Sequence, residues 1–517
     1  MNKKSLATAI IAGITGITGV VSVSNAVHIN PDNTGQVLLY PYYNTRNDNN
    51  TLISVVNTTD AGKAIKVRFL EGVNSQEVFD FNLYLSPFDV WTAAVVDSDT
   101  SDGATFITDD TSCTVPYFYG RNFAEGNTQP DTLVNFTDLL FAGDGGPQGL
   151  DRTREGYIEM IEMAEVVNGN GVQPNENTLA SITHVNDVPP GCFTVEAGFN
   201  IGTGYFLDSS VPDAIQTDMV PPAGGLFGDG TIINVAGARA FGYNATALDG
   251  FYDPAVAPVA IAPSLHTESG STLPSIGGSG FPATSNVLLS AGNVPVLVTD
   301  TWTAPGESFS DALNAVLMVD QVLNQYAIES FTEGGTQWVV THPNKGDTAA
   351  SGGSIAPYTV PFTGGNAGAL CEPALFTVFN REEAQITTEI PPLPSPFDVT
   401  LATVQLCNEV NILDFAGNGI FVSELGVELF PTEDQPGVDI PNSLSDVDFE
   451  SGWAQLAFNS VTAVNPAFDV EHELINVTSG NAYQGLPVVG FATRSANAGT
   501  FQFGTAFEHA YARIITN

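Results

Sequence analysis

The run Ile65-Lys66-Val67-Arg68-Phe69 alternates apolar and charged residues, and residues 79–85 (Phe-Asp-Phe-Asn-Leu-Tyr-Leu) continue the same alternation. A period of two is typical of β-strands that turn one apolar face toward a core. Residues 71–75 (Glu-Gly-Val-Asn-Ser) stand between the two runs and are short enough to join neighbouring antiparallel strands. The stretch therefore predicts an antiparallel meander.

Two further runs extend the predicted sheet. Residues 51–57 (Thr-Leu-Ile-Ser-Val-Val-Asn) are apolar on both faces, as a central strand would be, and residues 57–62 supply a turn after them. Residues 90–96 (Val-Trp-Thr-Ala-Ala-Val-Val) give a fourth strand, and β signals return in the last third of the chain, for example at 374–380. We predict a mainly β, antiparallel β-sandwich-like, multidomain protein.

One long buried helix is predicted near residues 311–328. Ser308 can cap its start, with Asp311 three residues on, and apolar residues then recur at helical spacing. Residues 155–167 fit either a helix or a strand, but Gly156 and the β-branched ending favour a strand.

The chain begins with the features of a secretion signal. Lys3 and Lys4 precede an apolar run over residues 6–23, and Ser24-Asn25-Ala26 fit a signal-peptidase site. We expect residues 1–26 to be a signal peptide and the mature protein to be exported. The expected domains are an N-terminal β domain at 27–197, a Gly/Pro/Ala-rich insertion or second domain at 198–300, and a C-terminal β domain with one helix at 301–517.

Acidic residues dominate the charge. The chain has 14 Lys and Arg against 57 Asp and Glu, and loss of Lys3 and Lys4 with the signal leaves 12 cations and a formal net charge of −45. Nucleic acid is not an expected partner, because phosphate binding requires clustered cations and these are scattered. Copies of so acidic a surface repel one another unless other cations bridge them.

The four cysteines predict two disulfides, because an even number in an exported chain is typical of cross-linked pairs. Of the three possible connectivities, Cys113 with Cys192 and Cys371 with Cys407 keep each pair within one predicted domain. Free buried thiols are the alternative. A metal cluster is disfavoured, because no pair has Cys-x-x-Cys spacing.

The predicted sheet and the run before it, Val37-Leu38-Leu39-Tyr40-Pro41-Tyr42-Tyr43, resemble the amino-terminal region of a surface-layer (S-layer) protein family of marine gammaproteobacteria. The resemblance covers residues 35–96. It implies a two-dimensional lattice of copies on the outside of the outer membrane, with the membrane surface, through lipopolysaccharide and divalent cations, as a second partner. It carries no catalytic residues.

Two acidic stretches are candidate calcium sites. Asp97, Asp99 and Asp102 lie close together with Ser and Thr between them and Gly103 after them, as oxygen-rich calcium loops require, although the spacing is not that of an EF-hand. A second candidate consists of Asp446, Asp448 and Glu450. The alternative for both is an acidic turn in water.

No catalytic motif stands out. The six histidines are too dispersed for paired metal ligands, and the one local cluster, Glu471-His472-Glu473, is predicted to be a solvated turn. With 57 carboxylates, some pair at glycosidase separation is expected by chance. We therefore expect a structural surface-layer subunit and not an enzyme; the alternatives are a secreted polysaccharide-active hydrolase and a carbohydrate-binding adhesin.

Overall fold

The structure is a computed structural model. It describes residues 26–99, 101–119, 132–169, 177–200, 204–207, 218–252, 266–277, 284–291, 294–328, 333–346, 356–358, 371–383, 385–387, 404–415, 419, 421–427, 429, 449–459, 472–498 and 501–516. All of the predicted signal peptide except Ala26 lies outside the described residues. The predicted class, a mainly β protein of antiparallel sandwiches, is confirmed.

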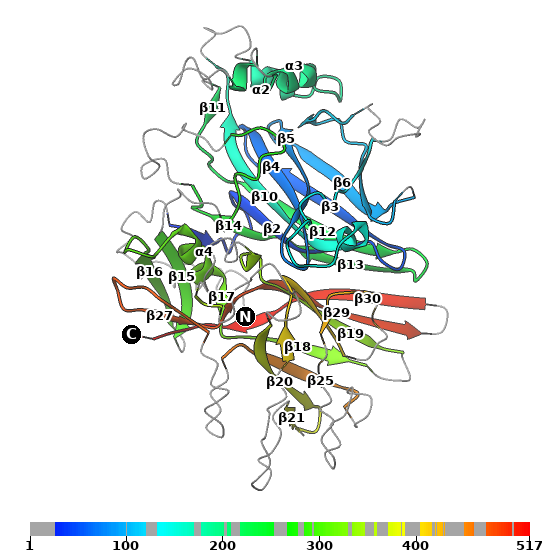
Figure 1. The fold of residues 1–517 in the computed structure, drawn as a ribbon, viewed down its shortest axis with the longest axis vertical. Coiled ribbons are helices and arrows are strands. Elements are labelled where there is room, and N and C mark those ends of the chain that lie inside the picture. Colours follow the sequence, from blue (N-terminus) through cyan, green and yellow to red (C-terminus); the bar gives the residue numbers. More distant parts are fainter. Residues whose placement is uncertain are drawn as a thin grey trace, which may run out of the picture.

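Two sheets form an N-terminal sandwich, drawn mostly blue to green in the upper part of Figure 1. Every strand pairing in it is antiparallel. The first sheet contains, in spatial order, β1 (His28–Ile29), β14 (Thr246–Asp249), β2 (Val37–Asn44), β10 (Glu155–Val166), β4 (Gly62–Glu71), β5 (Glu77–Leu85) and β8 (Cys113–Val115), with β11 (Met219–Val220) paired to β10. The second contains β13 (Arg239–Asn244), β12 (Leu226–Asn234), β3 (Asn49–Asn57), β6 (Val90–Asp97), β7 (Ala104–Thr108) and β9 (Thr132–Asn135).

The predicted strands exist, but the predicted meander is wrong. β4 and β5 are neighbours, whereas β3 and β6 lie in the opposite sheet and pair with each other. The chain therefore crosses between the sheets after β3 and returns after β5. Alternation fixes which side chains of a strand share a face, but it does not choose the partner strand.

Aromatic and aliphatic side chains fill the space between the two sheets. Ile65, Val67 and Phe69 of β4 meet Trp91 and Phe106 of the second sheet in one buried cluster. The other face of β4 is also buried: Lys66 and Arg68, which lie on it, are only 0% and 7% exposed. Residues 266–277 contact that face, where the Lys66 Nζ donates to the Glu268 carbonyl at 2.7 Å.

The segment 198–300 supplies strands to both sheets of the N-terminal sandwich. β12 pairs with β3 over nine residues, and β14 pairs with both β1 and β2. A separate hairpin of β15 (Thr284–Ala291) and β16 (Val294–Thr301) follows. The sheets of this sandwich thus extend past residue 197.

A second sandwich occupies the C-terminal part, in green to red in the lower part of Figure 1. One sheet has the order β21 (Gln385–Thr387), β20 (Glu372–Asn380), β25 (Ser451–Ala457), β18 (Gln321–Ala327) and β31 (Ala510–Ala512), with β22 (Val404–Leu406) paired to β20. The other has β24 (Gly426–Val427), β23 (Val410–Asp414), β19 (Gly335–Thr341), β29 (Val489–Ala498) and β30 (Phe501–Glu508). Smaller sheets pair β17 (Met318–Val319) with β28 (Leu486–Pro487) and join β26 (Glu473–Ile475), β27 (Ala482–Gln484) and β32 (Ile514–Thr516).

The helix predicted near 311–328 is shorter than expected. Helix α4 (Phe309–Leu317) begins with the predicted capping box of Ser308 and Asp311, but it ends at Leu317 and the chain continues as the strands β17 and β18. β18 pairs with β25 on one side and β31 on the other. These long-range pairings, together with the β-branched Val319 and Val322, outweigh the helical spacing of the apolar residues.

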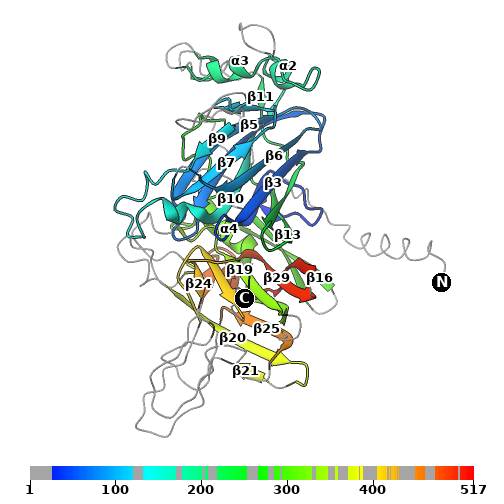
Figure 2. The ribbon, with the colours of Figure 1, turned by 90° about the vertical axis from the view of Figure 1, so that its right-hand side faces the viewer.

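Short helical turns complete the described elements. They are η1 (Leu150–Arg154), α2 (Thr178–Ile182), α3 (Cys192–Ala197) and η2 (Tyr205–Leu207). Figures 1 and 2 place α2 and α3 at the end of the molecule that is remote from the C-terminal sandwich. Within the described ranges, no helix combines the length and the apolar character needed to cross a bilayer.

The two sandwiches share a core. Val339, Ile412 and Phe491 of the C-terminal sandwich belong to the same buried cluster as the interior of the N-terminal one. Tyr243 stacks on Phe491 with ring centroids 4.6 Å apart and planes inclined by 9°. Because apolar side chains interdigitate across the junction, the two sandwiches pack as continuous parts of one body.

Candidate functional site

The structure forms both disulfides with the favoured connectivity. Cys113 in β8 is bonded to Cys192 at the start of α3, and Cys371 before β20 is bonded to Cys407 after β22. The first bond ties the α2–α3 region to an edge strand of the N-terminal sandwich. The second bond closes the β20–β22 connection next to the junction of the sandwiches.

The first predicted calcium loop is the turn of the β6–β7 hairpin. Asp97 ends β6, and its Oδ2 accepts a hydrogen bond from the Arg154 Nη2 at 2.8 Å. The Ser98 amide donates to the Gly103 carbonyl, which closes the turn. In the part of the chain that the structure describes, Asp97, Asp99 and Asp102 do not form a group that could hold a metal ion, nor do any other three His, Cys, Asp or Glu side chains. The calcium site stays a prediction.

The second predicted calcium site falls mostly outside the described residues. Asp446 and Asp448 are not among them, whereas Glu450 is exposed and its carbonyl accepts a hydrogen bond from the Ile328 amide. This site too stays a prediction.

His472 does not lie in a solvated turn, contrary to the sequence prediction. Its side chain is fully buried; Nε2 lies 2.9 Å from the Glu372 Oε2, and Nδ1 donates to the Phe458 carbonyl at 2.5 Å. The Glu372 carboxylate comes from a strand 100 residues earlier. A residue that looks isolated in sequence is thus part of a buried polar contact.

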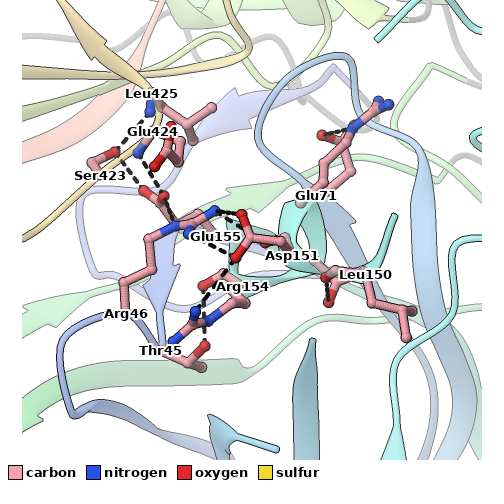
Figure 3. A network of polar contacts seen from close by, with 12 residues as sticks. Thr45, Arg46, Glu71, Leu150, Asp151, Arg154, Glu155, Ser423, Glu424 and Leu425 are labelled. Atoms are coloured by element: carbon pink, nitrogen blue, oxygen red, sulfur yellow. Dashed lines mark hydrogen bonds and ion pairs between the residues drawn. The ribbon is translucent and has the colours of Figure 1, made fainter. Parts of the chain in front are cut away.

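The most developed polar site is a network of ion pairs at the junction of the sandwiches (Figure 3). The Glu155 carboxylate, 2% exposed, accepts hydrogen bonds from the Arg46 Nε at 2.5 Å and from the Tyr42 hydroxyl at 2.8 Å. It also accepts from the Ser423 hydroxyl at 2.5 Å and from the Glu424 amide at 3.0 Å. The Glu155 carboxylate of β10 therefore binds the loop at Ser423 and Glu424, about 268 positions later in the sequence.

Arg152, which lies in η1, extends the network. The Arg152 guanidinium donates to both carboxylate oxygens of Glu71, at 2.7 and 2.9 Å, and lies 2.7 Å from the Asp144 Oδ2. Such forked pairing is geometrically specific and strong for a buried charge. Burial raises the pKa of Asp144, but hydrogen bonds from Arg152, Asn74 and the Gly146 amide together outweigh it and hold the pKa below its usual range.

Two further groups of charges lie along β4 in the first sheet, one on each face of the strand. The Lys63 Nζ, fully buried, lies 2.8 Å from the Glu162 Oε1 and 2.7 Å from the Glu165 Oε1. Arg68 bridges Glu77 and Glu159, each at 2.7 Å. Burial raises the pKa of Glu162 to about 7, although Lys63 opposes the shift.

A cavity of about 360 Å³ opens beside the network, lined by Arg46, Arg152, Glu155 and Glu424 among others. Asp151 also lines it; burial raises its pKa, but the hydrogen bonds and charges of Arg46 and Arg154 together outweigh that and hold the pKa below its usual value. A carboxyl with a lowered pKa is a poor general acid. The groups that line the cavity are arranged to neutralise one another and to fix the junction.

Sequence reasoning missed this network, although a signal for part of it was present. β4 carries cations at positions 63, 66 and 68, and β10 carries glutamates at 155, 159, 162 and 165. Their register, with Glu159 opposite Arg68 and Glu165 opposite Lys63, could be found once the two strands were paired. The contact between Glu155 and Ser423 has no local signal.

In comparisons with protein-family models, with curated proteins and with solved structures, none matched this chain.

Proposed function

We propose that this chain is the structural subunit of a two-dimensional layer on the outside of the outer membrane, held laterally by protein contacts and divalent cations. The observation that carries the proposal is the placement of the cations. Six cations of the N-terminal sandwich pair with carboxylates inside the protein: Arg46, Lys63, Lys66, Arg68, Arg152 and Arg154. Lys345 is only 1% exposed. These ion pairs stabilise the fold of the subunit. Because they use the cations inside the protein, acidic groups dominate its surface.

Two further features support a structural role for the chain. The two sandwiches share a core and the chain has two disulfides. A subunit packed in this way should resist deformation by neighbouring copies in the layer. The stretch at 35–96 that resembles surface-layer proteins lies in β2 to β6, at the centre of the N-terminal sandwich.

Electron microscopy of the cells that make the protein tests the proposal. Thin sections and whole-cell images should contain a repeating array over the envelope, and the array should be lost when the gene is deleted. The polypeptide should also be among the most abundant in the envelope fraction. A scarce protein released into the medium, with no array on the cells, would contradict the proposal.

Carbohydrate binding is a second candidate, supported by a partly exposed aromatic pair on the C-terminal sandwich. Phe379 and Trp453 stack with centroids 4.2 Å apart and planes inclined by 9°, and Trp453 is 39% exposed. Gln325 lies opposite Trp453 in the next strand and accepts a hydrogen bond from Arg494 at 3.2 Å. An aromatic face beside amide groups suits the mixed apolar and polar surface of a sugar.

Binding to purified envelope polysaccharide tests the second candidate. Trp453→Ala should abolish binding, whereas Phe503→Ala, which removes a 57% exposed ring elsewhere on the same sandwich, should not. Equal binding by both variants would contradict this role for Trp453.

A further inference from the structure

The hairpin of β15 and β16 leaves one strand edge open. The two strands form a sheet of their own, and β15 is bridged on its other side by Val27. Within the described ranges, β15 is the one strand that pairs with β16. Figure 1 shows β16 at the margin of the molecule, with β15 on its inner side.

A hydrogen bond of Val27 fixes which main-chain groups the open edge presents. The Asn286 amide donates to the Val27 carbonyl at 2.9 Å, so Asn286 turns its main-chain groups away from β16. Two residues directly opposite in an antiparallel pair turn their groups either toward each other or apart. Thr299, the partner of Asn286, therefore turns its amide and carbonyl outward on the open edge. Leu297, two positions earlier in β16, does the same.

Contacts at the two ends of β16 agree with this pattern. The Thr301 carbonyl, which also points outward, accepts a hydrogen bond from the Asn476 Nδ2 at 2.9 Å. Pro295 belongs to the same outward set and has no amide to donate, as is usual for proline in an edge strand. Between them, the amides and carbonyls of Leu297 and Thr299 have no hydrogen-bond partner in the part of the chain that the structure describes.

The exposed side chains of the hairpin are apolar. Leu288 lies directly opposite Leu297, and these two side chains are 56% and 51% exposed. Val296, on the other face of β16, is 41% exposed. An edge strand with open main-chain groups and apolar side chains is a template for pairing with a further strand.

Carboxylates do not guard this edge. Residues 269–299 are the longest run of the chain without Asp, Glu, Lys or Arg. Asp300 follows it, but its side chain is only 3% exposed and accepts a hydrogen bond from the Tyr483 hydroxyl at 2.5 Å. Glu307, the next acid, accepts a hydrogen bond from the Val477 amide at 2.7 Å. A second acidic copy therefore meets less repulsion here than at a strand that carries its own carboxylates.

We propose that β16 pairs antiparallel with β16 of a second copy across a two-fold axis at Leu297, so that the two hairpins form one four-stranded sheet. The inference rests on the proposed function and names one lateral contact of the layer. Two hydrogen bonds join Leu297 of one copy to Leu297 of the second copy. The Thr299 amide of each copy donates to the Pro295 carbonyl of the other.

The leucines favour a second copy over a strand of another protein. In the proposed register, Leu288 and Leu297 of each copy join those of the other in one row of four leucines across the sheet. Side chains that neighbour one another in this way stabilise strand pairing. Pro295 restricts the pairing to the residues that follow it, so the contact joins two copies and does not extend along the chain.

Site-directed cross-linking tests the contact. All four native cysteines are paired, so Val296→Cys introduces a single free thiol beside the axis and leaves Leu297 in place. A short bismaleimide should convert the concentrated, purified variant to a covalent dimer. Val235→Cys, at a 74% exposed position between β12 and β13, should stay monomeric under the same conditions. On intact cells, an adduct with a different polypeptide in place of the dimer would overturn the second copy as the occupant.

A proline at position 299 tests the strand pairing itself. Thr299→Pro removes an amide that points away from β15, so the hairpin keeps its own main-chain hydrogen bonds. Thr299→Val is the matched control, because both variants lose the hydroxyl bond to the Asn286 Oδ1 at 2.6 Å but valine keeps the amide. The two variants should therefore melt at similar temperatures.

In the Val296→Cys background, Thr299→Pro should lower the yield of dimer about tenfold or more, because the two-fold axis repeats the lost hydrogen bond. Thr299→Val should leave the yield unchanged. Equal yields from the proline and valine variants, or no dimer from Val296→Cys, would overturn the proposal.

Electron microscopy of cells separates this inference from the proposed function. Arrays that persist with Thr299→Pro, together with failure of Val296→Cys to cross-link, would overturn the contact and leave the layer. Cross-linked dimers from a protein that forms no array on its own cells would support the contact and overturn the layer.

Discussion

At the scale of single residues, Glu155 is the group whose loss should matter most, because its buried carboxylate is shared by both sandwiches. Glu155→Gln leaves Arg46 with a partly compensated charge and should lower the free energy of unfolding by about 3–5 kcal/mol. Asp97→Asn breaks an ion pair of which the carboxylate is 50% exposed, and it should change stability by about 1 kcal/mol or less. Chemical denaturation of both variants gives the comparison; equal losses would mean that Glu155 does not brace the junction.

His342 predicts a dependence of stability on pH. Burial, and then the charge of Lys345, lowers its pKa to about 3, whereas an unfolded histidine titrates near about 6.5. Below pH 6.5 the unfolded chain therefore binds a proton that the folded protein does not, and stability falls as the pH falls from 6.5 toward 3. His342→Gln should reduce the slope of the unfolding free energy by about 1.4 kcal/mol per pH unit between pH 4 and 6. Above pH 7.5 the two curves should run parallel; identical slopes at pH 5 would contradict the assignment.

At the scale of elements, α4 is buried on nearly every side, with Ser310 as its partly exposed member. Leu317→Ala should cost about 2–5 kcal/mol, because it removes a fully buried side chain at the point where the helix gives way to β17. Ser310→Ala loses one hydrogen bond, from Asn344, and should cost about 1 kcal/mol. Thermal unfolding and the level of secreted protein measure both. Comparable losses would indicate that the helix does not pack as described.

The sequence was informative about strands and uninformative about their partners. The runs at 51–57, 65–69, 79–85 and 90–96 all became strands, because local alternation and β-branched residues decide that much. Pairing β3 with β12 joins residues about 175 positions apart, and no local pattern encodes it. The same limit explains the end of α4, which depends on strands near residues 455 and 511, and the ion pairs of Glu155. The disulfide pairing was predicted because, of the three possible connectivities, it keeps each pair within one predicted domain.

At the scale of the whole molecule, the cations that pair inside the protein cannot offset the repulsion between acidic copies in the proposed layer. Without residues 1–26, the predicted signal peptide, the chain has 12 cations against 57 acids. Of these cations, six pair internally in the N-terminal sandwich and Lys345 is buried, so few are left to meet the carboxylates of a neighbouring copy. Monovalent salt screens exposed charges over about 8 Å at physiological ionic strength, but it does not join them.

We therefore expect assembly to require a divalent cation. Calcium takes six to eight oxygen ligands and can join carboxylates from separate loops or copies, which sodium cannot do. A calcium-selective chelator should release folded protein from the cell surface, and added calcium, but not sodium at equal ionic strength, should restore ordered arrays.

Because Asp97 is already paired with Arg154, the double variant Asp99→Asn/Asp102→Asn is the first to make. It should raise the calcium concentration needed for assembly several-fold, whereas Asp32→Asn/Asp48→Asn, an equal change of charge at two exposed sites, should not. Arrays that persist through prolonged chelation would mean that protein contacts alone hold the layer together.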